Sequence, residues 1–290
     1  MSYKKQKIIL VAAFLFVPLL LLVVFTYLPV VNIIWYSLND WNGLSPMEFC
    51  WFDNYIEIFS DPEYFLVLFN SIYYLAGSVV QMALGLFFAV LLSFRVRFKG
   101  FFKGTMFFPY LINGVAVGLI FVFFFRTDGT LNLILQNLFG VTEEQYFLEN
   151  APMNNVLLAG VSVWRYMGFN LVMFIGAIQS VSPELYEAAE MDGAGKLRIF
   201  FSIIFPMIKS IIALNLILAV KGAVSVFEVP YIMTKGSFDT STFVIRTIEL
   251  GIKNPRRQIG LASALSMVLF LIIMAVTAIQ KLLFKEKSED

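Results

Sequence analysis

Six long apolar stretches constrain this chain more than any other feature. A helix needs about 20 apolar residues to cross the hydrocarbon core of a bilayer. The six stretches are Ile8–Leu28, Phe65–Phe94, Thr105–Phe125, Val156–Ile178, Ile203–Lys221 and Ile259–Phe284. Only 14% of the residues are charged, and the mean hydropathy is +0.81. We therefore expect an all-α integral membrane protein with six transmembrane helices rather than a water-soluble enzyme.

The first stretch has two interpretations. Lys4, Lys5 and Lys7 precede it, as in the basic region of a signal peptide. However, its apolar run exceeds the usual 7–15 residues, and no small-x-small cleavage site follows it. We predict that it is a retained first span.

The distribution of Lys and Arg predicts the orientation, because cytoplasmic loops are enriched in both. With a cytoplasmic N-terminus, the inner segments carry Lys4, Lys5, Lys7, Arg95, Arg97, Lys99, Lys103, Lys196, Arg198, Lys281, Lys285 and Lys287. The outer segments then carry only Arg126, Lys235, Arg246, Lys253, Arg256 and Arg257. We expect both termini to be cytoplasmic.

The composition argues against several kinds of partner and site. A net charge of +1 gives no reason to expect nucleic acid. The chain has no His and one Cys, Cys50, so it offers no Cys/His zinc site, no His-dependent triad and no internal disulfide. We expect no catalytic residue, cofactor site or metal site on this chain.

The segment between the fourth and fifth apolar stretches, Ser180–Ile208, predicts a short loop helix with both ends marked. Ser182 suits the N-cap, and Pro183 suits the first helical position. Gly193 is the predicted helix terminator, since glycine tolerates the left-handed conformation after a helix. The predicted helix is Pro183–Asp192, about 15 Å long.

One side of this helix is small and partly apolar, formed by Leu185, Ala188, Ala189 and Asp192. Such a side fits a groove on a partner protein. The alternative is an amphipathic helix lying on lipid headgroups, for which Leu185 and Tyr186 would suffice.

The sequence EAAEMDGAGKLRIFFSIIFP resembles the EAA loop of ABC-importer permeases. The matching positions are Glu187, Ala188, Ala189, Gly193, Ile203 or Ile204, and Pro206. Asp192, Gly193 and Ala194 together resemble the carbohydrate-uptake branch, with its maltose-type and glycerol-phosphate-type permeases.

Shorter motifs extend the resemblance over most of the chain. They are Phe52–Tyr55, Asp61–Pro62, Asn70–Ser71, Gly129–Asn132, Phe227–Glu228 and Thr234–Gly236. Two positions depart from the family pattern: the glycine expected before Asn54 is absent, and Lys235, Gly236 and Ser237 replace Gly-Gly-Pro.

The resemblance implies a type I ABC importer transmembrane domain over residues 1–290, with a core at 65–284 and a coupling loop at 180–208. It also implies a second permease, two ATP-binding subunits that hold ATP and Mg²⁺, and an extracellular or periplasmic solute-binding protein. Closure of the ATPase dimer would then move the loop helix and rock the spans. The implied ATPase-coupling residues are Glu184, Glu187, Ala188, Ala189, Asp192 and Gly193.

The ATPase itself is not expected on this chain. Gly193–Lys196 superficially resembles a phosphate-binding loop, but Walker A requires G-x-x-x-x-G-K-[ST]. Glu190 stands where the first glycine is required, and Leu197 replaces the Ser or Thr.

Charged residues inside spans usually face a cavity or a partner, which draws attention to Arg165, Lys221 and Glu228. Lys221 and Glu228 are two helical turns apart and share a face if the helix continues that far. They would then form an ion pair lining a polar path. The alternative is that Lys221 extends to the outer interface.

Aromatic and amide side chains add candidates for contact with a sugar: Trp164, Phe169, Asn170, Asn113 and Asn215. Each has an alternative role in packing or hydrogen bonding between helices. The predicted substrate path comprises these five with Lys221 and Glu228.

The overall prediction is a permease subunit of an ATP-driven importer for a sugar, oligosaccharide or related polyol, in a bacterial or archaeal plasma membrane. One such chain would form half of the path. The alternatives are an ion-coupled secondary transporter, which would more naturally carry inverted repeats and acidic residues deep in its spans, and a membrane scaffold without a path. A membrane-bound enzyme is the weakest alternative.

Overall fold

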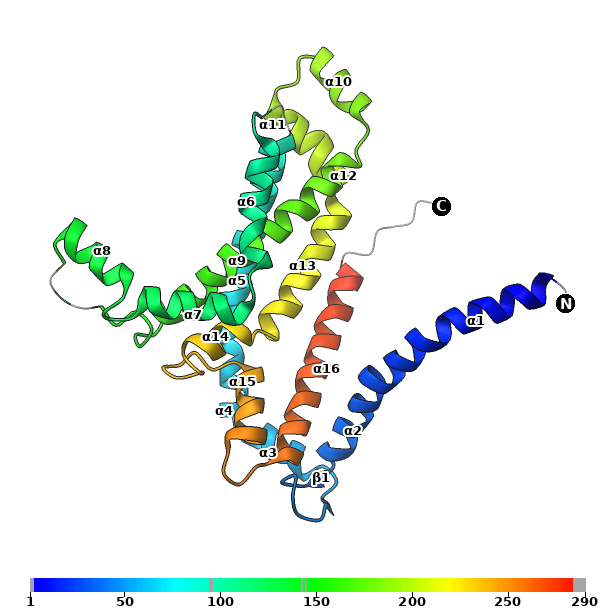
Figure 1. Cartoon of the computed structure of the whole chain (residues 1–290), viewed down its shortest axis with the longest axis vertical. Helices are drawn as coiled ribbons and strands as arrows, with labels where there is room; N and C mark the ends of the chain where they lie inside the picture. Colours follow the sequence, from blue (N-terminus) through cyan, green and yellow to red (C-terminus); the bar gives the residue numbers. More distant parts are fainter. Residues whose placement is uncertain (1–2, 94–95, 142, 144, 284–290) are drawn as a thin grey trace. The chain divides into compact units, whose positions relative to one another are not determined.

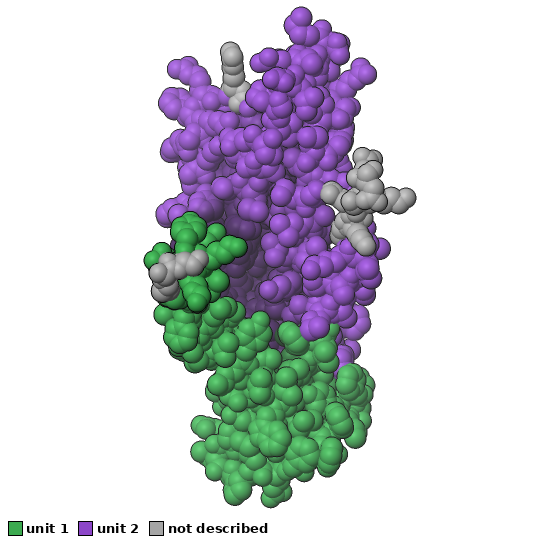
Figure 2. Space-filling model, turned by 90° about the vertical axis from the view of Figure 1, so that its right-hand side faces the viewer, with its two compact units in different colours: residues 1–64, 247–271 green, residues 65–246, 272–290 purple. Residues whose placement is uncertain are grey.

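The computed structural model describes residues 3–93, 96–141, 143 and 145–283. The chain divides into two compact units, coloured separately in Figure 2. Unit 1 comprises residues 1–64 and 247–271, and unit 2 comprises residues 65–246 and 272–290. The predicted span ends Phe94 and Phe284, with Arg95, Lys285 and Lys287, lie outside the described residues.

The described chain is almost entirely helical, in agreement with the apolar pattern. In unit 1 and at its borders lie α1 (Tyr3–Leu22), the π-helical turn η1 (Val23–Tyr27), α2 (Leu28–Ser37), the strands β1 (Asn39–Asp40) and β2 (Glu48–Phe49), α3 (Asp53–Ser60), α4 (Glu63–Leu66), α15 (Phe243–Ile248), η4 (Glu249–Lys253) and α16 (Ile259–Leu283). In unit 2 lie η2 (Val67–Asn70), α5 (Ser71–Ser93), α6 (Lys99–Leu111), α7 (Gly114–Phe125), α8 (Thr130–Phe139), α9 (Met153–Gln179), α10 (Pro183–Met191), α11 (Lys196–Ile199), η3 (Phe200–Ile204), α12 (Phe205–Met207), α13 (Lys209–Val224) and α14 (Glu228–Met233).

Six helical segments of the described chain are long and apolar enough to cross a membrane, which confirms the predicted number. They are Tyr3–Ser37, Glu63–Ser93, Gly114–Phe139, Met153–Gln179, Lys209–Met233 and Ile259–Leu283.

The third predicted span is wrong as a single helix. The chain leaves the helical conformation at Ile112 and Asn113, where ψ is 134° and 136°. Asn113 then caps α7, its side-chain oxygen accepting the Val115 N–H at 2.9 Å. Figure 1 shows α6 and α7 running in clearly different directions. Pro109 lacks an N–H for the helical ladder, and the asparagine cap offers the backbone a new start, so the apolar run of 105–125 divides.

Unit 1 is held together by backbone carbonyls and buried amides. The side-chain nitrogen of Asn54 donates to the carbonyls of Ser37 and Asn39 at 3.0 and 3.1 Å. Gly260, the second residue of α16, lies so close to the Asn39 carbonyl that a Cβ there would be 2.0 Å from its oxygen. The Gly260 N–H donates to Trp41 O at 3.0 Å. These contacts explain Asn54 of the Phe52–Tyr55 motif as a structural residue.

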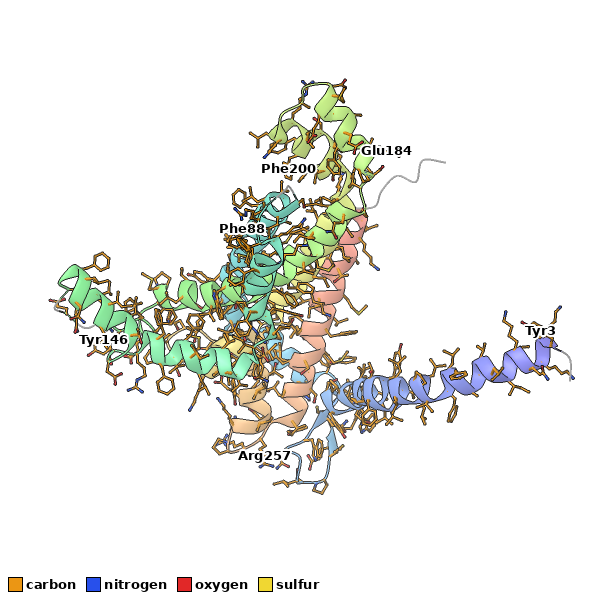
Figure 3. All side chains as sticks on the ribbon, turned by 45° about the horizontal axis from the view of Figure 1, so that its top comes forward. Tyr3, Phe88, Tyr146, Glu184, Phe200 and Arg257 are labelled. Carbon is orange, nitrogen blue, oxygen red and sulfur yellow. The ribbon has the colours of Figure 1, made fainter. Side chains whose placement is uncertain are left out.

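α1 has no buried residue, although it is apolar throughout from Ile8 onward. Its side chains extend outward on every side of the helix, from Tyr3 onward (Figure 3). A helix that is apolar all round is typical of a membrane span. This agrees with the prediction that the first stretch is a span.

Unit 2 is built around α9, which packs against α5 and α6, while α13 packs against α5. One apolar cluster lies beside the α10 loop and includes Leu171, Phe174 and Ile208. Phe88 and Phe200, labelled in Figure 3, pack against this cluster. A second cluster, including Val117, Leu158 and Val229, joins α7, α9 and α14.

Two further motifs of the sequence have structural roles in unit 2. A Cβ at Gly129 would lie within 3 Å of three backbone carbonyls, so the position requires glycine. Asn132, buried in α8, donates to Gln145 O at 2.9 Å and accepts the Gln145 N–H at 3.1 Å. Asn70 donates to the carbonyls of Asp239 and Ser241, both at 2.8 Å.

We expect Gly168→Ala to destabilise the protein by about 2 kcal/mol or more, the cost of overpacking a close contact. A Cβ at Gly168 on α9 would lie 2.0 Å from Met106 O and 2.7 Å from the Cα of Phe107 on α6, so two backbones must separate. Gly176→Ala is the matched control on the same helix, since its Cβ meets nothing within 4 Å. Thermal unfolding of both purified variants checks this; equal melting temperatures would contradict it.

Candidate functional sites: an exposed loop helix and a polar cavity

The loop helix α10 begins and ends where the sequence predicts, within one residue. Pro183 occupies its first turn, and Ser182 stands at the N-cap but makes no capping hydrogen bond with its side chain, so that detail of the prediction is wrong. At the other end Gly193 has φ +75°, a left-handed conformation that favours glycine. The Gly193 N–H donates to Glu190 O at 3.0 Å and the Ala194 N–H to Ala189 O at 2.9 Å. This pair of bonds is the Schellman motif, which stops the helix sharply.

α10 is attached to unit 2 by one side only. Tyr186 and Ala189 are half-buried against the neighbouring apolar cluster, and the Tyr186 hydroxyl donates to Ile178 O at 3.4 Å. Burial raises the pKa of the Tyr186 hydroxyl. α10 is therefore a docked element of the protein and not a free loop.

The other side of α10 is exposed. Glu184, Glu187, Ala188, Asp192 and Gly193 all lie on it. The sequence pattern placed Ala189 on the same side as Ala188 and Asp192, and this prediction is wrong, because Ala189 packs inward beside Tyr186. Leu185 and Met191 are exposed to 42% and 88%, so two separate apolar side chains stand among the carboxylates of α10.

A cavity of about 410 Å³ with a mixed polar and apolar lining lies within unit 2, between α5, α9, α13 and α14. Its lining residues are Tyr74, Ser78, Gln81, Ser162, Arg165, Tyr166, Phe169, Asn170, Asn215, Leu218, Ala219, Gly222, Ala223, Ser225, Val226, Phe227, Glu228 and Val229. The lining combines amides, hydroxyls and aromatic rings. It can therefore offer hydrogen bonds and ring faces to a small polar molecule.

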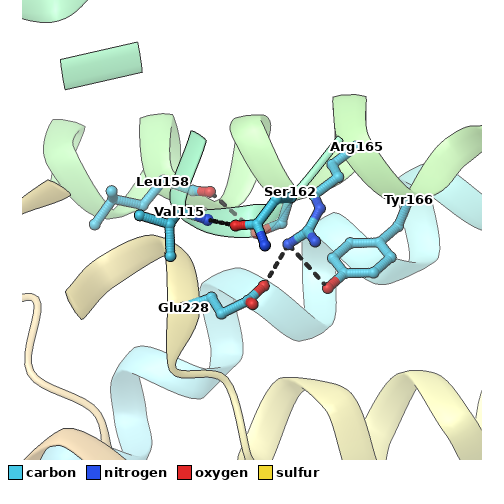
Figure 4. A network of polar contacts seen from close by, with 7 residues as sticks. Val115, Leu158, Ser162, Arg165, Tyr166 and Glu228 are labelled. Carbon is cyan, nitrogen blue, oxygen red and sulfur yellow. Dashed lines mark hydrogen bonds and ion pairs between the residues drawn. The ribbon is translucent and has the colours of Figure 1, made fainter. Parts of the chain in front are cut away.

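An ion pair joins two of the cavity helices. Arg165 Nη1 on α9 lies 2.5 Å from Glu228 Oε2 at the start of α14 (Figure 4). The Arg165 side chain is only 11% exposed, whereas that of Glu228 is 48% exposed. The guanidinium also lies over the Tyr166 ring, 5.2 Å from its centroid.

The first residue of α7 lies directly against this pair. A Cβ at Gly114 would be 2.1 Å from Glu228 Oε2 and 2.6 Å from Arg165 Nη1. The positive N-terminal end of α7 therefore adds to the guanidinium charge in stabilising the Glu228 carboxylate. The break between α6 and α7, which the sequence did not predict, places this helix end at the ion pair.

Four of the predicted path residues line the cavity: Phe169, Asn170, Asn215 and Glu228. Asn170 and Asn215 are buried, and each donates to the carbonyl one turn earlier in its own helix. Arg165, singled out as a charge within a span, lines the cavity with them.

Three predicted path residues lie outside the lining. Asn113 caps α7, Trp164 packs edge-on against Phe121 with centroids 5.3 Å apart, and Lys221 is exposed. The predicted Lys221–Glu228 ion pair is wrong. α13 ends at Val224, so the two residues do not share a helix, and Glu228 pairs with Arg165 instead.

Several lining residues were not among the predicted ones, chiefly Tyr74, Ser78 and Gln81 on α5. Their spacing of four and three residues puts them on one face of a helix. A polar stripe in an otherwise apolar span was the signal available for finding them.

Comparison with known proteins identifies the family. Residues 81–288 match the model of the binding-protein-dependent transport system inner membrane component. The chain belongs to this family. It is therefore a permease subunit of an ABC importer and a multi-pass inner-membrane protein, as the resemblance of the EAA loop indicated.

Curated relatives of this permease cover nearly its whole length. It is 32% identical to the probable ABC transporter permease protein YurN of Bacillus subtilis, over 94% of this chain and 96% of the relative. It is 33% identical to the diacetylchitobiose uptake system permease protein NgcF of Streptomyces coelicolor, over 92% and 80%. The multiple sugar-binding transport system permease protein MsmF of Streptococcus mutans is 29% identical, over 94% of each chain.

The fold of the permease also matches solved structures. A chain of a bacterial ABC transporter that imports the acidic polysaccharide alginate superposes with a TM-score of 0.84 at 18% identity, covering 98% of both chains. A second structure of a bacterial alginate ABC transporter, in complex with an alginate pentasaccharide-bound periplasmic protein, has the same TM-score and covers 98% of this chain and 96% of that one.

Proposed function

We propose that this permease is the transmembrane subunit of an ATP-driven importer for a sugar, oligosaccharide or related polyol, and that it forms half of the translocation path. The observation that carries the proposal is α10. Its inner side is held by Tyr186 and Ala189, and its outer side exposes Glu187 and Ala188. A short helix fixed to the protein by one side and bare on the other is suited to insertion into a groove on a partner.

The partner that we propose for α10 is an ATP-binding subunit, one of two, which holds ATP and Mg²⁺ and carries out hydrolysis. The residues in the contact are Glu184, Glu187, Ala188 and Asp192, with Gly193 setting the end of the helix. Because α10 is packed on the cluster that includes Leu171, Phe174 and Ile208, movement of α10 is transmitted to α9 and the helices beside it.

The remaining partners and the orientation follow from the same scheme. α10 and both termini lie in the cytoplasm of a bacterium or archaeon, consistent with the distribution of Lys and Arg. A second permease completes the path, and residues 1–290 act as one transmembrane domain with it. A solute-binding protein delivers the solute from outside, in keeping with the family description and with the periplasmic protein bound in one solved relative.

The solute class rests on the cavity and on the relatives. Amides, hydroxyls and aromatic rings are among the groups that line this cavity of about 410 Å³. Two of the relatives are named for multiple sugars and for diacetylchitobiose. We propose that Phe169, Asn170, Asn215 and Glu228 contact the solute, with Asn113, Trp164 and Lys221 nearby on the path.

The test is isolation of the tagged chain from native membranes in mild detergent, followed by uptake measurements in reconstituted vesicles. We expect a second permease, an ATPase and a solute-binding protein to co-purify, and uptake to require ATP hydrolysis. Uptake driven by an ion gradient without nucleotide would contradict the proposal in favour of a secondary transporter. Recovery of the chain alone, under conditions that preserve known complexes, would favour a scaffold.

A further inference from the structure

The charge of the cavity is balanced by two residues. Of the described residues that line it, only Arg165 and Glu228 are charged, and they are paired with each other at 2.5 Å. Their charges sum to zero. The rest of the polar lining consists of neutral amides and hydroxyls, such as Gln81, Asn170 and Ser162.

The balanced charge of the lining affects which solutes can enter the cavity. A charged solute must give up its hydration on entry, and burial of a charge without a partner is strongly unfavourable. Arg165 is already paired with Glu228, so its charge is not available to compensate the charge of an entering anion. An uncharged molecule with many hydroxyls loses much less, because it has no charge to desolvate and can donate to the hydroxyl and amide oxygens of the lining.

The cavity also contains buried polar atoms that the described protein leaves without a hydrogen bond. The Tyr74 hydroxyl and Arg165 Nε are both buried and have no partner among the described residues. Tyr74 is 4% exposed and lines the cavity. Both atoms are covered by neighbouring groups, so a solute in the cavity does not reach them in this conformation, and the balance of charge is what distinguishes one solute from another here.

We propose that this cavity admits uncharged, hydroxyl-rich solutes and excludes anionic ones such as uronates and sulfonates, with Arg165 and Glu228 as the specificity-determining pair. The proposal rests on the cavity being part of the transport path and adds the charge of the solute. It makes Glu228 the residue that keeps Arg165 from attracting anions.

The test uses thiol reagents that differ in charge, because the solute itself is unidentified. Ser162 on α9 lines the cavity and lies in the network around the ion pair (Figure 4). The variant Ser162→Cys is prepared in a Cys50→Ser background, since Cys50 is the one native cysteine. The assembled transporter in vesicles is then treated with hydroxyethyl, sulfonatoethyl or trimethylammonioethyl methanethiosulfonate, which are neutral, anionic and cationic.

We expect the neutral reagent to react faster than either charged one. Adding Glu228→Gln leaves the cavity with one positive charge, and the ratio of anionic to neutral rates should rise about tenfold, as for one unit charge at short range in a partly buried site. Adding Arg165→Gln should raise the cationic-to-neutral ratio instead. The double variant should restore the parental ratios. A ratio also cancels any change in the reactivity of the thiol itself.

Glu149→Cys, at an exposed position in the segment before α9, provides the control, and its reagent ratios should not respond to either substitution. The proposal is overturned if the parental cavity reacts equally fast with anionic and neutral reagents, or if Glu228→Gln leaves their ratio unchanged. Labelling requires no transport, so a failure here is distinct from a loss of ATP-dependent uptake, which would count against the proposed function.

Discussion

Glu187→Lys should reduce uptake by about a hundredfold, the size expected when a central residue of a protein interface is lost, while the protein still inserts and folds. Glu187 is exposed on α10, so the substitution disturbs no packing within the chain. It reverses a charge on the side that we assign to the ATPase. ATP-dependent uptake in vesicles and the amount of co-purified ATPase are the two measurements.

Glu149→Lys is the matched control for this charge reversal. Glu149 is also exposed, but it precedes α9, whereas α10 follows α9. The two positions are thus separated by the length of a 27-residue helix, about 40 Å. We expect Glu149→Lys to retain the co-purified ATPase. Full uptake by Glu187→Lys would remove α10 as the coupling element.

The end of α10 gives a second way to disturb the same contact. Gly193→Ser forces a side chain into the left-handed conformation at φ +75°, at a cost of about 1–2 kcal/mol. Gly195→Ser is its control, because Gly195 has an extended conformation at the N-cap of α11, where serine is favoured. Neither position has an atom within 4 Å of an added Cβ, so the two differ in conformation and not in space.

The Arg165–Glu228 pair should show a strong non-additive effect on stability. Glu228→Gln leaves the Arg165 guanidinium, 11% exposed, without its carboxylate. Breaking a fully buried pair costs about 3–5 kcal/mol; because the Glu228 side chain is 48% exposed, we expect about 2 kcal/mol here. Arg165→Gln should cost less, since the remaining carboxylate keeps access to water and to the N-terminus of α7.

The double variant Arg165→Gln/Glu228→Gln distinguishes the pair from two independent residues. We expect it to be more stable than Glu228→Gln alone, because no buried charge remains unpaired. Thermal unfolding in detergent of the four proteins forms the double-mutant cycle. If the two single losses simply add, the residues do not act as a pair, and the neutral balance of the cavity loses its basis.

The spans and the loop helix could be predicted from the sequence because both depend on local properties. A span requires only a sufficient run of apolar residues, and six such runs are present. The ends of α10 depend on Pro183 and Gly193 through their own φ angles, which neighbouring elements do not change. For the same reason the two ends were correct to within one residue.

The charged residues that meet in the cavity lining could not be predicted from the sequence, because their pairing depends on the tertiary structure. Which of two charged residues faces Glu228 is decided by where α13 ends and how α9 approaches α14. Arg165 and Glu228 are 63 residues apart in the chain. The sequence favoured Lys221 because it is near in the chain. The fold selected Arg165 because it is near in space.

The division of the apolar run at 105–125 has the same origin. Hydropathy alone does not distinguish one helix from two, and Asn113 looked like a path residue within a span. In the structure it caps α7, which brings Gly114 against the ion pair. The sequence alone thus determined the number of spans, the loop helix α10 and the family, since each depends on local runs of residues. Only the tertiary structure decided which polar groups meet inside the membrane, because that meeting depends on contacts between helices far apart in the chain.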